Sequence, residues 1–189
     1  MKKFFLLLTL LCLSLSAWAH DAEVDGIFYN LDAANKTATV TFQGDDAFSY
    51  DNEYSGDVVI PETVIYNGIT YSVTSLADGC FQYCSSLTAI TIPNSVKSLG
   101  DDCFYSCSSL TSITIGNSVT SLGDGCFSRC SSLTSIYMLS STPPSTGSEI
   151  FKYTPLETVY VVSENAKKAY QAQWYWNNYA IVVKRTGIK

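Results

Sequence analysis

Histidine is nearly absent from this chain, and that scarcity excludes several kinds of chemistry. The single histidine, His20, lies near the N-terminus. A Ser-His or Cys-His hydrolase needs a histidine that the fold holds beside the nucleophile, and a zinc site needs several converging ligands. The sequence also lacks a glycine-rich phosphate-binding loop. We therefore expect no catalytic residue, no metal site and no cofactor.

Basic residues are also scarce. The chain has 11 Lys and Arg against 17 Asp and Glu, which gives a net charge of −6. A surface with excess negative charge repels nucleic acid and anionic lipid, so we expect no nucleic-acid partner. Charged residues make up only 15% of the chain, whereas tyrosine occurs 13 times. This balance favours a β-rich protein over a helical one.

A long apolar run occurs only within the first 19 residues. Lys2 and Lys3 precede an apolar stretch at 4–15, and Ala17-Trp18-Ala19 follows it. This order is typical of a secretory signal peptide, cleaved before His20. No later segment is apolar enough to span a bilayer. The sequence thus predicts an exported protein without a membrane span after cleavage, located in the extracellular medium, on the cell surface or in the periplasm.

Internal repetition is the strongest feature that the sequence does have. From Val73, Val96 and Val119 the chain reads VTSLADGCFQYCSSLTAITIPNS, VKSLGDDCFYSCSSLTSITIGNS and VTSLGDGCFSRCSSLTSIYMLSS. The period is 23 residues, and the second and third units are identical at 15 of 23 positions. Such a repeat is typical of a solenoid, in which each coil buries its apolar face only against its neighbours.

Each unit predicts one short strand and one helical turn. The strand is the L-x-x-I-x-I segment, residues 110–115 in the second unit, whose alternation leaves one face buried. In Cys-Phe-x-x-Cys the apolar residues recur at helical spacing, and an aspartate precedes them in every unit. These aspartates stand where they can cap the helical turn, which we favour over a cation site. They are Asp78, Asp101 and Asp124.

The units resemble the BspA-type leucine-rich repeats, which read roughly Ile-Gly-x-x-Ala-Phe-x-x-Cys-x-x-Leu-x-x-Val-x-Ile-Pro-x-x-Val. Residues 57–162 follow this pattern in period and in the positions of Phe, Cys and Leu. Two features depart from it: Cys80, Cys103 and Cys126 replace the usual Ala, and of these three units only the first keeps the proline, Pro93. The resemblance implies a solenoid of leucine-rich repeats with one parallel sheet of short strands. It also implies a bacterial surface or secreted protein with an interaction role.

The residues before the solenoid predict a β-rich N-terminal cap over residues 20–56. Segments 24–31 and 37–43 read as two strands of this cap. At the start of the solenoid, Asn67-Gly68 stands between alternating residues and predicts a two-residue hairpin. Terminal units of a solenoid are expected to differ from the rest because they close its open ends.

The residues after the solenoid predict a second cap, residues 163–189. Ser163 is placed to cap a helix that runs to about Gln173, and residues 180–183 read as a last strand. The cluster Trp174-Tyr175-Trp176 is expected to close the end of the solenoid. The alternative is that it forms a ligand platform.

The repeat cysteines fall into two columns, Cys80-Cys103-Cys126 and Cys84-Cys107-Cys130. Stacked coils bring neighbours in a column close enough for disulfides. Three cysteines in one column cannot all pair, however, and no redox motif is present. We therefore interpret them as small buried core residues, with disulfides between coils as the alternative.

Outward positions of the repeat strands predict a surface for binding. They are Thr88, Thr91, Thr111, Ser112, Thr114, Thr134, Ser135 and Tyr137. A flat face rich in hydroxyl groups suits an extracellular or surface protein or a glycan, although a solvated strand face carries the same residue types. We therefore predict a non-enzymatic, adhesin-like binding module that acts through the solenoid surface.

Two other functions stay open. The acidic stretch GDDAFSYDNEYSGD, residues 44–57, offers carboxylates to an extracellular glycan hydrolase, although it lacks the spacing of a calcium loop. A pocket between residues 45 and 57 that holds two carboxyl groups at catalytic separation would favour the hydrolase, whereas a flat face favours the binding module. The third function is that of a structural component of an envelope complex. Open solenoid ends also allow self-association.

Overall fold

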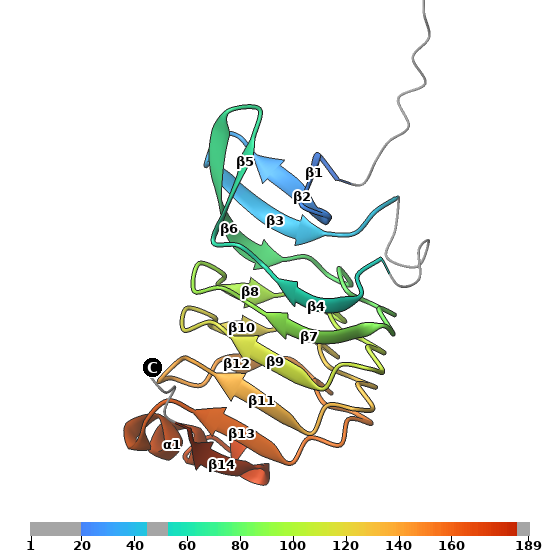
Figure 1. Cartoon of the computed structure of the whole chain (residues 1–189). Coiled ribbons are helices and arrows are strands. Elements are labelled where there is room, and N and C mark those ends of the chain that lie inside the picture. Colours follow the sequence, from blue (N-terminus) through green and yellow to red (C-terminus); the bar gives the residue numbers. More distant parts are fainter. Residues whose placement is uncertain (1–19, 45–52, 185–189) are drawn as a thin grey trace, which may run out of the picture.

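The computed structural model describes residues 20–44 and 53–184. Over these ranges the chain winds into a stack of coils, with a β-rich cap at one end and α1 (Glu164–Gln171) at the other (Figure 1). This stack is the solenoid that the 23-residue period predicts.

One side of the stack is a parallel sheet, and in the described ranges it has six strands in the order β14-β13-β11-β9-β7-β4. The strands β7, β9 and β11 pair one period apart, for example Ile90 with Ile113 and Tyr137 with Thr114. The predicted adjacency of the repeat strands is therefore confirmed. The bounds are β4 (Gly56–Val59), β7 (Leu87–Thr91), β9 (Ser112–Ile115), β11 (Ser135–Met138), β13 (Thr158–Val161) and β14 (Ala180–Val183).

A second sheet, which the repeats did not indicate, is built from the Val-x-x-Leu segments. Two of them contribute strands of two residues, β8 (Ser98–Leu99) and β10 (Ser121–Leu122), and β12 (Ser145–Thr146) pairs next to β10 in the degraded fourth unit. These pair in parallel and continue onto β6 (Ile69–Leu76). Two residues are too few to show a strand alternation in the sequence, so the expected single sheet is one of two.

The N-terminal cap extends this second sheet. Its strands are β1 (Ala22–Val24), β2 (Ile27–Asp32) and β3 (Thr37–Thr41), and β3 pairs with β6. β5 (Thr63–Tyr66), at the start of the solenoid, also pairs with β6. The hairpin predicted at Asn67-Gly68 joins β5 to β6, and both residues have the positive φ (50° and 77°) that such a tight turn needs. Asp25-Gly26 makes an equivalent turn between β1 and β2, which the sequence analysis missed.

Stacked aromatic rings form a column inside the coils. The ring of Phe104 lies between those of Phe81 and Phe127, with centroids 5.0 and 5.3 Å away and planes tilted by 12° and 3°. Phe151 continues the column in one direction and Tyr54 of the cap in the other. All three repeat phenylalanines are fully buried, so this column is part of the hydrophobic core.

Both cysteine columns lie in the same core. All six thiols are free and buried, so their interpretation as core residues is confirmed. The Cys107 thiol donates a hydrogen bond to the Phe81 carbonyl at 3.0 Å, and Cys130 does the same to Phe104 at 3.1 Å. Each bond links one coil to the coil before it.

The prediction of a helical turn in each unit is wrong. Residues 101–106 form a series of turns instead, because Asp102 and Ser106 have φ of 49° and 59°, in the left-handed region. The corresponding residues of the other units also have positive φ, and a right-handed helix cannot pass through them. They are Gly79 and Tyr83, Gly125 and Arg129, and Glu149 and Tyr153.

The aspartates therefore cap a different group from the one expected. Asp101 Oδ1 accepts the backbone N–H of Asp124 in the next coil at 2.7 Å, and Asp78 makes the same bond to Asp101 at 2.8 Å. This contact requires close approach of the two chains. A Cβ atom on Gly123 would lie 2.4 Å from Asp101 Oδ1, so the residue before the next aspartate must be glycine. The ladder is a connection between coils.

The C-terminal cap has the helix and strand that the sequence predicts. Ser163 caps α1 by accepting the N–H of Ala166 at 3.1 Å, and β14 pairs in parallel with β13. Trp176, in η1 (Trp176–Asn178), is buried and its Nε1 donates to the Pro144 carbonyl, whereas Trp174 is 76% exposed. One tryptophan thus closes the end and the other faces solvent. Across the described ranges, no helix has the length and hydrophobicity needed to cross a membrane.

Candidate functional site

Three of the predicted threonines lie near the starts of their strands: Thr88 is the second residue of β7, and Thr111 and Thr134 directly precede β9 and β11. The Thr111 backbone N–H and hydroxyl both donate to the Thr88 carbonyl, at 3.0 and 3.1 Å. The Thr88 hydroxyl donates to Asp57 Oδ1 at 2.7 Å. Thr134 occupies the same position one coil further on, where its carbonyl accepts the N–H of Glu157. These threonines therefore connect coils.

The other predicted residues lie on what we call the outer face, the exposed side of the six-stranded sheet. Strand register aligns its side chains in two rows. The first row is Asp57, Ala89, Ser112, Ser135, Thr158 and Ala180; the second is Val59, Thr91, Thr114, Tyr137, Tyr160 and Val182. Side chains of the alternate residues, such as Ile113 and Ile136, are fully buried. The outer face is thus a regular surface fixed by the core behind it.

Two tyrosines and a lysine form a cluster on the second row. The rings of Tyr137 and Tyr160 stack with centroids 4.8 Å apart and planes 19° apart. Lys184 Nζ donates to the Tyr137 hydroxyl at 2.6 Å and lies 4.5 and 5.1 Å from the two ring centroids. The hydrogen bond to Tyr137 raises the pKa of Lys184, so the ammonium stays charged. The cluster joins an aromatic surface to a positive charge and a hydroxyl group.

Sequence reasoning identified only Tyr137 of this cluster. Tyr160 lies 23 residues further on, at the same position of the degraded fourth unit, so the repeat period would have found it. Lys184 follows β14, which has no counterpart in the repeat text, and only the register of β14 on β13 brings it near the rings. No signal in the sequence places that lysine.

A second exposed surface, the turn edge, carries Tyr83, Tyr105, Arg129 and Tyr153. The rings of Tyr83 and Tyr105 meet edge to face at 5.6 Å. The Arg129 guanidinium lies 5.8 Å from the Tyr105 ring centroid and 5.2 Å from that of Tyr153. These are cation–π contacts, which contribute about 0.5–1 kcal/mol when exposed. Because three of these residues and Ser106 share the left-handed backbone, that conformation belongs to the coil and does not by itself mark a site.

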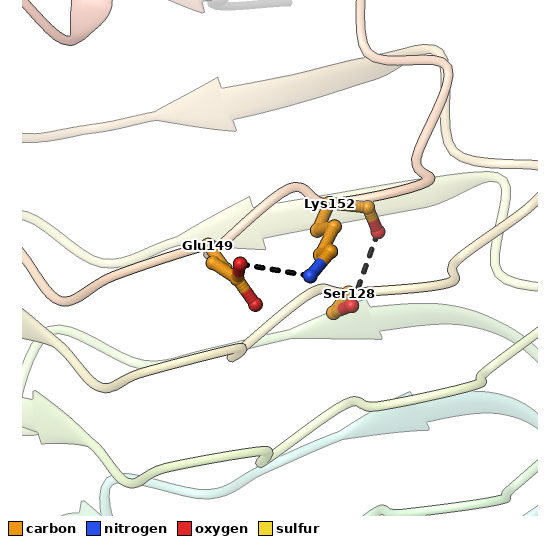
Figure 2. Close-up of polar contacts among 3 residues, drawn as sticks. All are labelled: Ser128, Glu149 and Lys152. Carbon is orange, nitrogen blue, oxygen red and sulfur yellow. Dashed lines mark hydrogen bonds and ion pairs between the residues drawn. The ribbon is translucent and has the colours of Figure 1, made fainter.

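Polar contacts beside Arg129 tie the last coils of the turn edge together. Figure 2 shows Lys152 Nζ paired with Glu149 at 2.8 Å, while the Lys152 carbonyl accepts the Ser128 hydroxyl at 3.1 Å. The ion pair is exposed and spans one turn of chain, so it adds little stability. Its effect is to position the Lys152 ammonium 5.5 Å from the Tyr153 ring.

The acidic N-terminal region contains a cavity of about 330 Å³ lined by Asp25, Glu53 and Asp57. Both Glu53 oxygens accept the backbone N–H of Gln43, at 3.0 and 3.1 Å. Burial raises the pKa of Glu53 to about 7. Residues 45–52 of the acidic stretch lie outside the described residues, so the structure bears on Glu53 and Asp57 alone among its carboxylates. Glu53 has the pKa of a general acid, but its oxygens bind backbone.

Four of the buried cysteines, Cys84, Cys103, Cys107 and Cys130, are poorly suited to act as nucleophiles. Burial raises the pKa of Cys84 and of Cys130 to about 12, and it raises the pKa of Cys103 and Cys107 well above the ordinary value. A thiol with such a pKa is protonated at neutral pH and unreactive. Over the described ranges, no group of three or more His, Cys, Asp or Glu is placed to hold a metal ion.

Comparison with known proteins decides the family. The model of the BspA-type leucine-rich repeat region matches residues 44–179 in six copies. The chain belongs to the BspA-type leucine-rich repeat family. This match runs beyond residues 57–162, where the repeat pattern was recognised in the sequence, at both ends. No curated protein matches the chain.

Solved structures of leucine-rich repeat proteins have the same fold. One from Bacteroides ovatus is 28% identical with a TM-score of 0.63, covering 87% of this chain and 38% of its own. One from Bacteroides capillosus is 24% identical with a TM-score of 0.61, covering 75% and 98%. A third, from T. pallidum, is 21% identical with a TM-score of 0.50, covering 74% and 71%. This chain thus spans 38% of the length of the Bacteroides ovatus protein. It is a repeat-based interaction module.

Proposed function

We infer that this protein is an exported, non-enzymatic binding module of adhesin-like type, which recognises an extracellular or surface protein or glycan through the outer face. The observation that carries this proposal is the cluster of Tyr137, Tyr160 and Lys184 on a register-fixed sheet. Tyrosine is one of the residue types that dominate recognition surfaces, and both rings are partly exposed on the outer face. Because the sheet is rigid, ordering these side chains on binding costs little entropy.

The hydroxyl rows extend the contact that the cluster begins. Thr91 and Thr114 continue the row of Tyr137 toward β4, and Ser112 and Ser135 lie on the row beside it. Hydroxyl groups both donate and accept hydrogen bonds, which suits the polar edge of a sugar or a peptide backbone. Aromatic rings supply the apolar contact that such a ligand also needs. Export is supported by the signal-peptide pattern of residues 1–19 and by the family resemblance.

Binding is tested with the exported protein on panels of host-matrix proteins, bacterial-surface fractions and glycans. The variant Tyr137→Thr/Tyr160→Thr removes the stacked rings and places at both positions the residue that Thr114 already provides on the same row. We expect this variant to lose binding while its thermal unfolding stays close to that of the parent.

A matched control removes an exposed tyrosine elsewhere. Tyr153→Ser on the turn edge uses the residue that Ser106 already provides in the left-handed conformation, and it should bind as the parent does. Loss of binding in Tyr153→Ser with retention in the double variant would transfer the function to the turn edge. Export is tested separately by cell fractionation and by sequencing the N-terminus, which should begin at His20.

An extracellular glycan hydrolase is the second candidate, and the cavity at Glu53 is the observation that favours it. A carboxyl group with a pKa near 7 suits a general acid. The hydrogen bonds from Gln43 to both Glu53 oxygens argue against it. Turnover of a glycan that the parent shows and Glu53→Gln lacks would establish the hydrolase; we expect no turnover from either.

A further inference from the structure

The six-stranded sheet ends at β4, and within the described residues no strand pairs with the far edge of β4. An edge strand presents backbone N–H and C=O groups that can pair with another extended chain. At the other end of the same sheet, β14 is the corresponding edge. The β4 edge faces a cavity between itself and the N-terminal cap, lined by Val58 and Val59 on one side and by Asp25 and Ile27 on the other.

Backbone alternation shows which groups of β4 are available. Gly56 N–H donates to Ser86 O at 2.9 Å and Ile60 N–H donates to Thr91 O at 3.1 Å, both toward β7. Successive residues of a strand alternate in direction, so Val58 also faces β7. The N–H and C=O groups of Asp57 and Val59 consequently point away from β7, toward the open edge. The register irregularity at the start of this pair places its extra residue on β7, so the alternation along β4 is preserved.

Two cavities lie along this edge and share Asp25, Ile27 and Val59. Their volumes are about 330 and 390 Å³, within the range of ligand pockets. The second is mainly apolar and is lined also by Pro61 and Ile65. Val59 is 70% exposed and Ile65 is 64% exposed, so the groove has an apolar side that nothing in the described chain covers.

The charge of the residues that line the two cavities indicates the composition of a peptide that would bind at the β4 edge. The first cavity, beside the start of β4, is lined by three acidic residues, Asp25, Glu53 and Asp57. Two of their carboxyl groups also accept hydrogen bonds, Glu53 from the Gln43 N–H and Asp57 from the Thr88 hydroxyl. Among the described residues that line either cavity, none is Lys or Arg. An occupant with a basic side chain at this end and apolar side chains over Val59 and Ile65 would be complementary in both charge and polarity.

We propose that the β4 edge is a docking site for an extended peptide of a partner protein, in which a basic residue is followed by apolar residues. The peptide adds a strand to the sheet through the backbone of Asp57 and Val59, which is the recognition mode of β-strand addition. Its basic side chain contacts the acidic cavity and its apolar side chains fill the second cavity. This surface is separate from the outer-face cluster at Tyr137, so either proposal can fail without the other.

The test uses a fluorescent peptide of about six residues, Lys-Lys-Val-Thr-Val-Val, long enough to pair with all of β4. Two matched probes accompany it: one with both lysines replaced by glutamate, and one with N-methyl groups on alternate amides, which block strand pairing. Fluorescence anisotropy with the exported protein should give saturable binding of the first probe. The glutamate and N-methyl probes should bind at least about tenfold more weakly.

Variants locate the binding. Val59→Lys places a charged, bulky side chain at the junction of both cavities and should weaken binding of the lysine probe at least about tenfold. Val182→Lys is the matched control, since Val182 occupies the same row at the opposite edge of the sheet and is also exposed; it should bind as the parent does. Asp25→Asn, which tolerates the positive φ of 51°, should reduce the preference for lysine over glutamate.

Several results would overturn the proposal. The proposal fails if the parent shows no saturable binding of the lysine probe, or if the N-methyl probe binds as tightly as the lysine probe. It also fails if Val59→Lys binds the lysine probe as the parent does while its unfolding temperature equals that of the parent. Sedimentation of the parent and Val59→Lys tests the competing occupant. A concentration-dependent dimer that Val59→Lys abolishes would show that a second copy occupies the edge, and this too would overturn the peptide assignment.

Discussion

Replacement of Phe104 by alanine should destabilise the protein strongly. The ring is fully buried and stacks on Phe81 and Phe127 at 5.0 and 5.3 Å, so its removal leaves a hole in the middle of the aromatic column. Truncation of a buried phenylalanine costs about 3–5 kcal/mol, and two lost ring contacts place this one near the upper end. Such a loss is comparable with the whole stability of many domains, about 5–15 kcal/mol.

The matched variant Cys107→Ala should cost much less. Its thiol is equally buried and donates to the Phe81 carbonyl at 3.0 Å, but that carbonyl also accepts the N–H of Cys84 at 3.2 Å. Removing the thiol thus leaves a small cavity and no unsatisfied acceptor. We expect a loss of about 1 kcal/mol.

Urea unfolding followed by circular dichroism measures both losses, and hydrogen exchange shows how far each one spreads. The amide of Phe81 donates to Cys103 and that of Phe104 donates to Cys126, so Phe104→Ala should speed exchange in the neighbouring coils as well. A chelator should leave the midpoint unchanged. A loss for Cys107→Ala as large as for Phe104→Ala, or unfolding by the chelator, would refute the reasoning that the cysteines only pack.

Three further predictions concern the turns and the cap. Gly123→Ala should cost about 2–3 kcal/mol in thermal or urea unfolding, since its Cβ would lie 2.4 Å from Asp101 Oδ1, whereas the control Ala77→Gly should cost only about 0.5–1 kcal/mol; equal losses would contradict the close-approach argument. Asp102→Gly should raise stability by about 0.5–1 kcal/mol, because it relieves a φ of 49° on a residue with a side chain; a loss of stability would contradict this. Burial raises the pKa of Glu53 from 4.5 to about 7, so the folded state keeps a proton that the unfolded state releases, and stability should fall as pH rises through this window. Glu53→Gln should remove this fall, which for a half-exposed group amounts to about 1–1.5 kcal/mol; an unchanged pH dependence would contradict the assignment.

Much of the fold is predictable because each coil of a solenoid repeats the same local sequence pattern. The alternation of buried and outward-facing residues, with Ile113 and Ile115 buried, predicts the strand of each unit. The period then predicts which strands are neighbours. Short-range signals such as Asn67-Gly68 and Ser163 also identify their hairpin and helix. The prediction of a helical turn between Asp101 and Cys107 was wrong, because the helical spacing of apolar residues does not reveal that Asp102 and Ser106 have left-handed backbone conformations. Tertiary stacking of coils overrides the local helical pattern there.

The candidate site was less predictable than the fold. Alternation places Thr114 and Tyr137 on one exposed row, and the structure agrees with that placement. Alternation cannot show that Thr111 directly precedes β9 and that its hydroxyl donates to the Thr88 carbonyl. Nor can it bring Lys184 next to Tyr137, because that contact depends on the register of a strand outside the repeats. The sequence predicts the positions of residues that follow the repeat period, but it does not predict the contacts made by residues of the caps.

Stacking constrains some columns of the repeat and leaves others free, and this difference indicates where function lies. The columns of Phe104, Cys107 and Gly123 hold one coil against the next, so a change in any of them disturbs two neighbours. The second row of the outer face differs from these columns, because its residue type varies: it holds Thr91 and Thr114 in two coils and Tyr137 in the third. The row therefore changes along the stack, from Val59 on β4, through the hydroxyl groups of Thr91 and Thr114, to the stacked rings of Tyr137 and Tyr160, and it ends in Val182 on β14. A scaffold that is uniform inside and graded outside can present two different binding surfaces on one sheet, and the outer-face and β4-edge experiments separate them because they change opposite ends of that sheet.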